Sequence, residues 1–400
     1  MIVFVLVVCL MAGSTLASAQ DLELTALRTI LVPLRGQPLA RPEVRGATVQ
    51  FTPIKHQLRD WVESRFDEFP ERGAEAVLAR ELNATLQKSD LTCSTNRNVP
   101  GEYCPMDSLV GYLGPVRISR QQEFLLVETA VGIACGYDES AYLYRWNGQQ
   151  WNRVWSSEQL VYTEKQYVPQ MFHAVKVSAG RPGQKNHLVL TLGSNPHCTS
   201  NWQPVFYRLW RVEEKEQAAV LLFDKSEMAF LGKDEPPIVG TVRTQDVTVE
   251  FSTASLDPAT NNRNAVRRFN VMGAKPRRVA PIAMTPRNFV EEWITQPWSE
   301  SSRWSSSQAL LKWHKRFFTS SVEFTAASNR CPDSGDLWQV SLRITSIKEQ
   351  PAKEKDNPTY FLVRWRKPYL FTLIDVQERA WPKCTTPSTD EYRTLLKHHR

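Results

Sequence analysis

The sequence predicts a β-rich α+β protein with an N-terminal helix pair, repeated antiparallel β-sheet units, and C-terminal helices packed on an antiparallel sheet. Three observations support this prediction. Apolar residues recur at helical spacing from about 53 to 89, and the period changes to two from about 108 to 224. A third is that helical and then alternating patterns follow each other again after residue 282. With 400 residues and 42% hydrophobic composition, two or three domains are expected.

The N-terminus has the pattern of a signal peptide, predicted over residues 1–19. The apolar run "IVFVLVVCLM" is followed by Ala17-Ser18-Ala19, a small-x-small cleavage pattern that gives a mature start at Gln20. The run is too short for a permanent spanning helix, so the mature chain is expected to have no transmembrane span. It is expected to be exported, either periplasmic or extracellular. The segment contains no Lys or Arg, and a short uncleaved anchor is the alternative.

Residues 20–107 are predicted to be a helical region with a disulfide loop. Thr52-Pro53 is typical of an N-cap followed by proline in the first helical position. Two apolar stripes follow and indicate an antiparallel helix pair over about 53–89: Ile54, Leu58, Trp61 and Val62, then Val77, Leu78, Leu82 and Leu86. Asn83-Ala84-Thr85 matches a glycosylation sequon, but it lies in the middle of the second helix and carries little weight.

Residues 108–235 are predicted to be a β-rich domain with an approximate 63-residue internal repeat. Strands are expected at "EFLLVETAV", "AYLYRW", "QWNRVW", "NHLVLTLG" and "VFYRLWRV". Without a gap, "LLVETAVGIACGYDESAYLYR" aligns with "LVLTLGSNPHCTSNWQPVFYR". The alignment places Leu125 on Leu188 and Tyr144 on Tyr207, which favours a duplicated sheet unit.

The segment "AYLYRWNGQQWNRVWSSE" predicts an aromatic hairpin. A two-residue turn at Asn147-Gly148 would pair Tyr144 with Trp151 and place four aromatic residues on one face: Tyr142, Tyr144, Trp146 and Trp151. Such a face suits either a sugar-stacking platform or a sheet core. The second copy has Val205 and Leu209 at the flanking positions, and this favours core. Over about forty residues the hairpin resembles a blade of secreted β-propellers; a closed propeller needs four or more blades, and this region has room for about three.

Residues 236–281 are predicted to be a β and basic connecting segment, and residues 282–384 a helix-on-antiparallel-sheet domain. Thr285-Pro286 repeats the cap-and-proline signal, and "RNFVEEWI" places Phe289, Val290, Trp293 and Ile294 on one helical face. A further helix is expected over about 306–317. Strands are expected at "LWQVSLRITSI", "TYFLVRW" and "LFTLIDV", the first with Trp338, Val340, Leu342 and Ile344 on its inner face. Residues 385–400 form a polar tail.

Six cysteines remain after removal of the signal peptide, which contains Cys9: Cys93, Cys104, Cys135, Cys198, Cys331 and Cys384. An even count in an exported chain predicts disulfides, with 15 possible connectivities, and local pairs are favoured. Cys93 and Cys104 bracket a loop of turn-forming residues. Cys135 and Cys198 would be neighbours if the two repeats stack. Metal binding is the alternative, but no CxxC and no paired His motif supports it, so we expect no metal. No cofactor is expected either.

The net charge of +7 is unevenly placed. Residues 258–290 contain no acid, but seven basic residues: Arg263, Arg267, Arg268, Lys275, Arg277, Arg278 and Arg287. Such a segment attracts polyanions, so an anionic envelope polymer or an acidic protein is the expected partner. A solvated basic loop without a partner is the alternative. Nucleic acid is not expected to be the partner of an exported chain.

No catalytic motif stands out, and no catalytic residue is assigned. The chain has no GxSxG, HExxH, Walker-type or dinucleotide-binding motif, and His197 next to Cys198 is not a natural thiolate–imidazole couple. The function expected from the sequence is therefore a non-enzymatic binding or structural protein of the cell envelope or extracellular space. The alternative is a secreted hydrolase acting on a glycan or other envelope polymer, for which Asp138 and Glu139 are the nominated carboxylates. A solvated turn is the structural interpretation of that acidic pair.

Overall fold

The computed structural model describes residues 22–35, 48–66, 74–93, 109–134, 136–159, 169–180, 186–195, 201–213, 219–230, 238–256, 262–272, 275–279, 283–318, 322–332, 335–347, 358–367, 370–384 and 386–387. The predicted signal peptide lies outside these residues, as do Cys104, Cys135 and Cys198. The chain divides into two compact units, residues 1–225 and 226–400.

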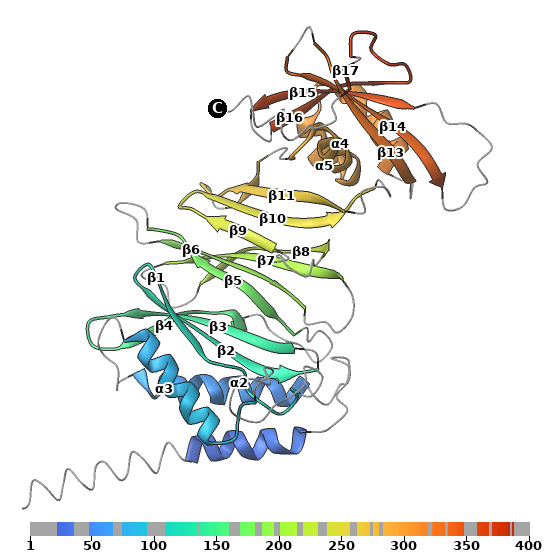
Figure 1. Ribbon diagram of the computed structural model, residues 1–400. Coiled ribbons are helices and arrows are strands. Elements are labelled where there is room, and N and C mark those ends of the chain that lie inside the picture. The colour runs from blue at the N-terminus through green and yellow to red at the C-terminus, as the bar shows by residue number, and fades with distance from the viewer. Residues whose placement is uncertain are drawn as a thin grey trace, which may run out of the picture. The chain divides into compact units, whose positions relative to one another are not determined.

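The described strands form four antiparallel sheets, and each sheet follows the order of the chain. The sheets are β1-β2-β3-β4, β5-β6-β7-β8, β9-β10-β11-β12 and β13-β14-β15-β16, with the short β17 beside β13 (Figure 1). This up-and-down order is also that of a propeller blade. The prediction of a β-rich α+β chain is confirmed. The predicted β-rich domain of residues 108–235, with room for about three blades, contains two of these sheets, β1–β4 and β5–β8.

The strands of the first two sheets are β1 (Arg117–Gln121), β2 (Phe124–Ile133), β3 (Gly136–Trp146), β4 (Trp151–Ser156), β5 (Met171–Val177), β6 (His187–Ser194), β7 (Trp202–Val212) and β8 (Val220–Phe230). The third sheet comprises β9 (Ile238–Val242), β10 (Asp246–Ala254), β11 (Asn262–Asn270) and β12 (Arg277–Arg278). The fourth comprises β13 (Val322–Arg330), β14 (Leu337–Ile347), β15 (Thr359–Lys367), β16 (Leu370–Gln377) and β17 (Thr386–Pro387).

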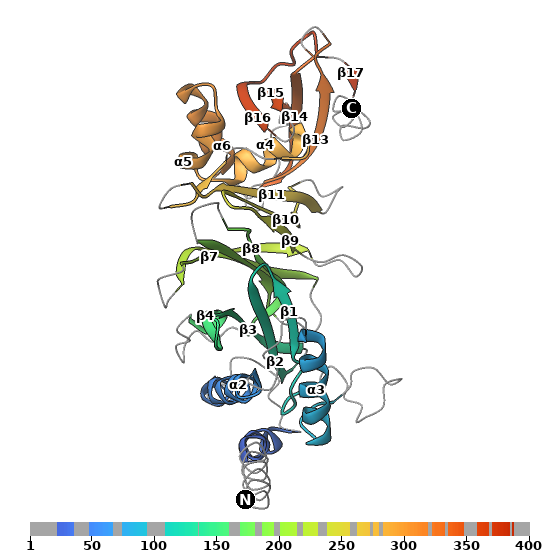
Figure 2. The same ribbon diagram turned by 90° about the vertical axis from the view of Figure 1, so that its left-hand side faces the viewer.

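The first unit is layered on both sides of the β1–β4 sheet. Helices α2 (Thr48–Glu63) and α3 (Glu75–Lys88) cover one face, together with a helix over residues 22–31 (Figures 1 and 2). The β5–β8 sheet covers the other face. Alternation along β3 divides the side chains accordingly: Tyr142 and Tyr144 join the helices, and Leu143 joins the second sheet.

Helix α2 begins earlier than the sequence predicted. It starts at Thr48, and Pro53 lies inside it rather than in its first position. The buried stripe begins with Phe51, one turn before Ile54, so packing of Phe51 extends the helix across the expected cap. The helix over residues 22–31 was not predicted, although its buried Leu24, Leu27 and Leu31 recur at helical spacing.

Asn83 has a structural role in α3. Its amide nitrogen donates to Ala79 O at 2.7 Å and Val116 O at 2.8 Å, and its Oδ1 accepts from Val116 N at 2.8 Å. The side chain thus ties the segment before β1 to the helix, and its amide is committed to these contacts rather than to a glycan.

The aromatic hairpin has a longer loop than predicted. Trp146 pairs with Trp151 and Tyr144 with Arg153, so four residues rather than two connect the strands. Asn147 Oδ1 accepts from the backbone N–H groups of Gln149 and Gln150, and Asn147 N donates to Gln150 O. The Asn side chain stabilises this wider loop through a local turn of its own, so the two-residue register is wrong.

The predicted repeat corresponds to two sheets whose central strands are β2–β3 and β6–β7, but the ungapped alignment is wrong in register. In the first copy Leu125 pairs with Tyr144, so the alignment requires Leu188 to pair with Tyr207 in the second copy. Tyr207 instead pairs with Leu192, four residues after Leu188. The connection between the two strands is therefore longer in the second copy.

In the second unit, α4 (Pro286–Thr295) starts as predicted, because Thr285 Oγ1 accepts from Asn288 N. This helix packs with α6 (Leu311–Phe318) on the last sheet, and α5 (Trp298–Ser301) lies between them in sequence. The core includes the predicted helix residues Phe289, Val290, Trp293 and Ile294, and the strand residues Trp338, Val340 and Leu342.

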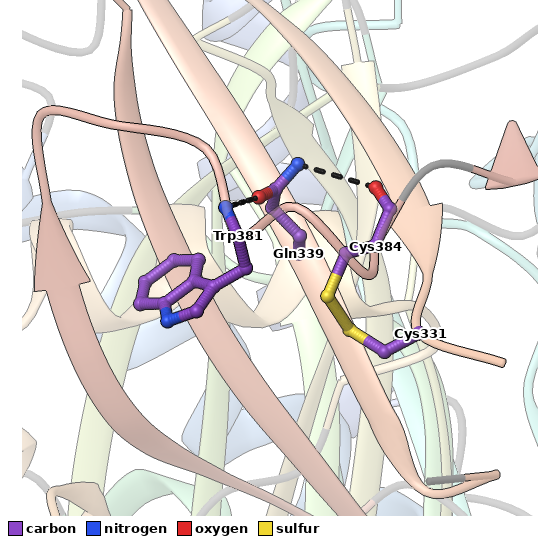
Figure 3. Close-up of a disulfide and its surroundings, with 4 residues drawn as sticks. All are labelled: Cys331, Gln339, Trp381 and Cys384. Atoms are coloured by element: carbon purple, nitrogen blue, oxygen red, sulfur yellow. Dashed lines mark hydrogen bonds between the residues drawn. A yellow bond between two sulfur atoms is a disulfide. The ribbon is translucent and has the colours of Figure 1, made fainter. Parts of the chain in front are cut away.

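A disulfide joins Cys331 to Cys384 beside this sheet (Figure 3). Gln339 lies next to it; its Oε1 accepts from Trp381 N at 2.7 Å, and its Nε2 donates to Cys384 O at 3.5 Å. Gln339 is 2% exposed although it belongs to the face of β14 predicted to be wet, because the Trp381–Cys384 segment covers it. Cys93 is also disulfide-bonded, but its partner is not among the described residues.

Candidate functional site

The acidic pair Asp138 and Glu139 lies in β3 rather than in a solvated turn. Both residues are buried, at 1% and 7% exposure, and as neighbours in a strand they point to opposite faces. Asp138 Oδ2 lies 2.7 Å from Lys55 Nζ of α2, and Oδ1 accepts from Gln170 N. The pair therefore cannot flank one bond of a substrate, and the turn interpretation is wrong because pairing partners make burial of both carboxylates possible.

Glu139 instead shares an arginine with Glu128. Arg117 Nη2 lies 2.9 Å from Glu139 Oε1, and Arg117 Nε lies 3.5 Å from Glu128 Oε2. Glu139 Oε2 also accepts from Phe172 N. Burial raises the pKa of both carboxyl groups, and the Arg117 guanidinium opposes that rise. Arg117 is half exposed, so this carboxylate pair borders solvent at one side.

The tyrosines of the aromatic face are core residues with anchored hydroxyls. Tyr142 is 0% and Tyr144 1% exposed. Tyr142 OH donates to Glu158 Oε1 at 2.7 Å, and Tyr144 OH donates to Glu63 Oε1 at 2.8 Å. Burial raises the pKa of both phenols well above the ordinary value, with a further contribution from the glutamates. These rings offer no face to a ligand.

Trp146 and Trp151 are half-buried at the end of the same hairpin. Their rings meet edge to face at 5.5 Å, and Arg120 lies over Trp151 while pairing with Glu75 of α3. The aromatic residues nominated by the sequence thus divide into two core tyrosines and two tryptophans at the rim of the sheet.

The acid-free basic segment, residues 258–290, also contains both buried and exposed members. Its inner members surround two adjacent glutamates of α4: Arg263 lies 3.1 Å from Glu291 and 3.2 Å from Glu292, and Arg267 lies 3.0 Å from Glu292. Arg278 also pairs with Glu292, and Arg287 lies 3.8 Å from Glu291. We call these six residues the arginine–glutamate cluster. Arg267 additionally binds Glu227 with two hydrogen bonds.

The two glutamates of this cluster differ in their proton affinity. Burial raises the pKa of Glu291, and Arg263 opposes the rise. Burial acts on Glu292 in the same direction, but Arg267, Arg263 and Arg278 together lower its pKa to about 2. Glu292 is therefore charged at any physiological pH and holds three arginines inside the unit.

The outer members of the basic segment are exposed. Arg268 and Arg277 lie on the solvent face of the third sheet; Arg277 pairs with Asn270, which lies opposite Asp246. Arg268 is bound by Asp246 at 2.8 Å. Lys275 precedes Arg277 and is exposed, as is Arg243 in the turn before Asp246. The sequence therefore overstated the basic charge available to a partner, because it showed the arginines without their buried carboxylates.

Four described histidines have polar neighbours; His56 Nε2 lies 3.7 Å from Glu158 Oε2. His173 Nε2 lies 2.8 Å from Ser194 Oγ, but Ser194 is fully buried. His187 is bound to Ser178 O and Glu123 Oε1, and His314 Nε2 donates to Gln296 O. Burial lowers the pKa of His314. No group of three or more His, Cys, Asp or Glu in the described ranges is placed to hold a metal ion.

Sequence reasoning missed Glu128, Glu158, Glu291 and Glu292. A signal existed for the last two: they interrupt the apolar face of "FVEEWI" and follow a long segment without acid. Charges inside a buried helical face require partners, and the arginines immediately before them were the available ones. Nothing in the sequence marked Glu128 or Glu158.

No protein-family model matches the chain, and no curated protein matches it in sequence. Among solved structures it is similar to the GH93 alpha-L-arabinofuranosidase of Fusarium graminearum in complex with arabinobiose, at 9% identity over 66% of each chain and a TM-score of 0.25. It is also similar to the GH32 beta-fructofuranosidase of Bombyx mori, at 7% identity over 68% of this chain and 75% of that chain, with a TM-score of 0.19. These TM-scores are too low to show a shared fold.

Proposed function

We propose that the protein is an exported, non-enzymatic binding protein whose exposed basic side chains contact an anionic envelope polymer. Export is supported by the signal-like N-terminus together with the Cys331–Cys384 disulfide, because disulfides persist in oxidising compartments. In the described ranges, no helix combines the length and apolar composition needed to cross a membrane.

The observation that supports this proposal is that the basic segment contains both buried, paired arginines and exposed basic residues. Arg263, Arg267, Arg278 and Arg287 are committed to buried glutamates, whereas Arg268, Lys275 and Arg277 remain exposed on or beside the third sheet. The inner group fixes the sheet edge against α4, and the outer group presents cations to solvent. An anionic polymer would be attracted by the outer group through screened, long-range electrostatics.

The test is retention on a soluble polyanion, dextran sulfate, as salt is raised. The variant Lys275→Glu/Arg277→Glu should elute at lower salt than the wild type, because two exposed cations become anions. Arg80→Glu/Lys88→Glu, which makes the same charge change on exposed residues of α3, is the matched control. Equal elution of the two variants would reject these residues as the binding surface. Arg267 and Arg278 are left unchanged because their loss would remove two of the three arginines that pair with Glu292.

The second candidate is the glycan hydrolase, and the Glu128–Arg117–Glu139 group favours it. Two carboxyl groups with raised pKa on one sheet face are the type of pair that glycoside hydrolysis uses. Turnover of a polysaccharide panel should then be abolished by Glu128→Gln and by Glu139→Gln separately. Turnover that survives both substitutions, or that is absent from the wild type, eliminates this candidate.

A further inference from the structure

Helix α6 carries a second basic surface that the sequence did not single out. His314 and Phe317 face the core of the second unit, while Lys312, Lys315 and Arg316 are exposed. The helix contains no acidic residue. Glu378, after the end of β16, lies 3.1 Å from Arg316 and is itself 63% exposed. The outward side of α6 is therefore a ridge of cations.

Aromatic side chains lie on both flanks of this ridge. Trp313 is half-buried and lies under Lys312 and Arg316, whose cationic groups are each 5.6 Å from its ring. On the other flank Phe318 stacks on His314 at 5.2 Å and is still 48% exposed. Cations flanked by a half-buried tryptophan and an exposed phenylalanine match a partner surface that is both anionic and apolar.

From these observations we propose that the α6 surface, defined as Lys312, Trp313, Lys315, Arg316 and Phe318, docks on an anionic lipid bilayer. The cations would contact the headgroups, and Trp313 and Phe318 would enter the interfacial layer beneath them. A soluble polyanion would satisfy the cations but would leave Phe318 in water. This proposal is independent of the polymer-binding surface at Lys275 and Arg277, which lies on other elements.

The test is co-sedimentation of the full chain with vesicles of equal parts phosphatidylglycerol and phosphatidylcholine, compared with phosphatidylcholine alone. We expect preferential binding to the anionic vesicles. Lys312→Glu/Lys315→Glu should lower the partition coefficient by roughly 25-fold or more, since each lysine contributes about a fivefold factor near such a surface. Arg80→Glu/Lys88→Glu makes the same net charge change on exposed residues of α3 and should reduce the coefficient far less.

The variant Phe318→Ser distinguishes binding to an anionic lipid bilayer from binding to a soluble polyanion. It should weaken binding to anionic vesicles by roughly fivefold, because about half an aromatic side chain no longer enters the bilayer, and it should leave retention on dextran sulfate unchanged. The proposal is overturned if the Lys312/Lys315 variant binds anionic vesicles like the wild type. It is also overturned if Phe318→Ser has no effect on vesicle binding, since the surface would then recognise charge alone. Circular dichroism of each variant confirms that α6 and the core are retained.

Discussion

At the scale of single residues, Glu292 is a buried carboxylate of the second unit that several arginines share. Its side chain is 2% exposed and has Arg263, Arg267 and Arg278 as partners. Replacing one member of a buried pair leaves the opposite charge uncompensated, and this usually costs about 3–5 kcal/mol. The same substitution on an exposed acid such as Glu250 should cost less than about 0.5 kcal/mol.

We therefore expect Glu292→Gln to destabilise the protein at pH 7, and the difference from the wild type to depend on pH. The folded pKa of about 2 lies below the ordinary 4.5, so the carboxylate stabilises the fold above pH 4.5. That contribution, about 3 kcal/mol, is lost as the pH falls from 4.5 towards 2. Urea unfolding of both proteins between pH 7 and pH 2 measures it; a constant difference over this range would contradict the low pKa.

The wild type must be compared with the Glu292→Gln variant because other carboxyl groups change the stability in the opposite direction as the pH falls. The pKa of Glu291, Glu128 and Glu139 is raised by burial, so these groups favour the folded state more as the pH falls through their folded pKa. The pH profile of the wild type alone would mix the two effects. Subtracting the pH profile of the Glu292→Gln variant from that of the wild type isolates the contribution of Glu292 to the free energy of unfolding.

At the scale of secondary-structure elements, α2 docks on the first sheet through charges as well as through its apolar stripe. Lys55 pairs with Asp138, and Arg59 pairs with Glu158 at 3.0 Å. These partners fix which turn of the helix faces which strand. An apolar stripe alone would tolerate a shift by one turn, whereas displaced buried charges would not.

Lys55→Met is expected to lower the free energy of unfolding by about 3–5 kcal/mol, because Asp138 remains buried without its cation. Adding Asp138→Asn should recover part of this loss, since the amide is neutral and its oxygen still accepts from Gln170 N. Lys88→Met on the exposed side of α3 is the control and should change little. A double variant less stable than Lys55→Met would show that the pair does not act as a unit.

Two tryptophans of the aromatic hairpin allow a similar prediction about stability, in which one substitution serves as the control for the other. Trp155 is 1% exposed between the two sheets and meets Trp210 at 6.1 Å, whereas Trp151 is half-buried at the rim. Trp155→Ala should cost about 3–5 kcal/mol and Trp151→Ala clearly less. Thermal unfolding of the two variants gives this ranking; equal midpoints would mean that the rim tryptophan is as important to the core as the central one.

The sequence predicted those elements whose pattern is local. The cap at Thr285 and the strands at "EFLLVETAV" and "AYLYRW" follow from turn chemistry and alternation, and they were found, although β3 begins earlier than predicted, at Gly136. It failed where long-range contacts decide the outcome. The start of α2 depends on packing of Phe51, and the burial of Asp138 depends on Lys55, which precedes it by more than eighty residues. Neither contact has a signature in the local pattern.

At the scale of the whole molecule, both compact units contain disulfide-bonded cysteines among their described residues. The second unit has the Cys331–Cys384 disulfide, which closes a loop of 53 residues around β14, β15 and β16. In the first unit the described cysteine Cys93 is also bonded. A cross-link over a loop this long restricts the unfolded chain and can contribute about 4 kcal/mol.

We expect Cys331→Ser/Cys384→Ser to destabilise the second unit selectively. Hydrogen exchange should accelerate in β13–β16 and α4, while amides of β2 and β3 in the first unit keep their protection, because each unit has its own hydrophobic core. Mass spectrometry of peptides from both units gives the comparison. Uniform acceleration across the chain would show instead that the two units unfold as one.

The arginine–glutamate cluster also has an evolutionary consequence. Loss of Glu292 removes a shared carboxylate from three arginines, although Arg263 keeps Glu291 and Arg267 keeps Glu227. A single substitution of Glu292 is therefore expected to be selected against, whereas a concerted change of Glu292 and its arginines to apolar residues of similar volume is expected to be tolerated. Descendants of a common ancestor are expected to keep the whole charged set or to replace it together. Arg268, Lys275 and Arg277, which lack this mutual dependence, are free to drift one at a time unless a partner holds them.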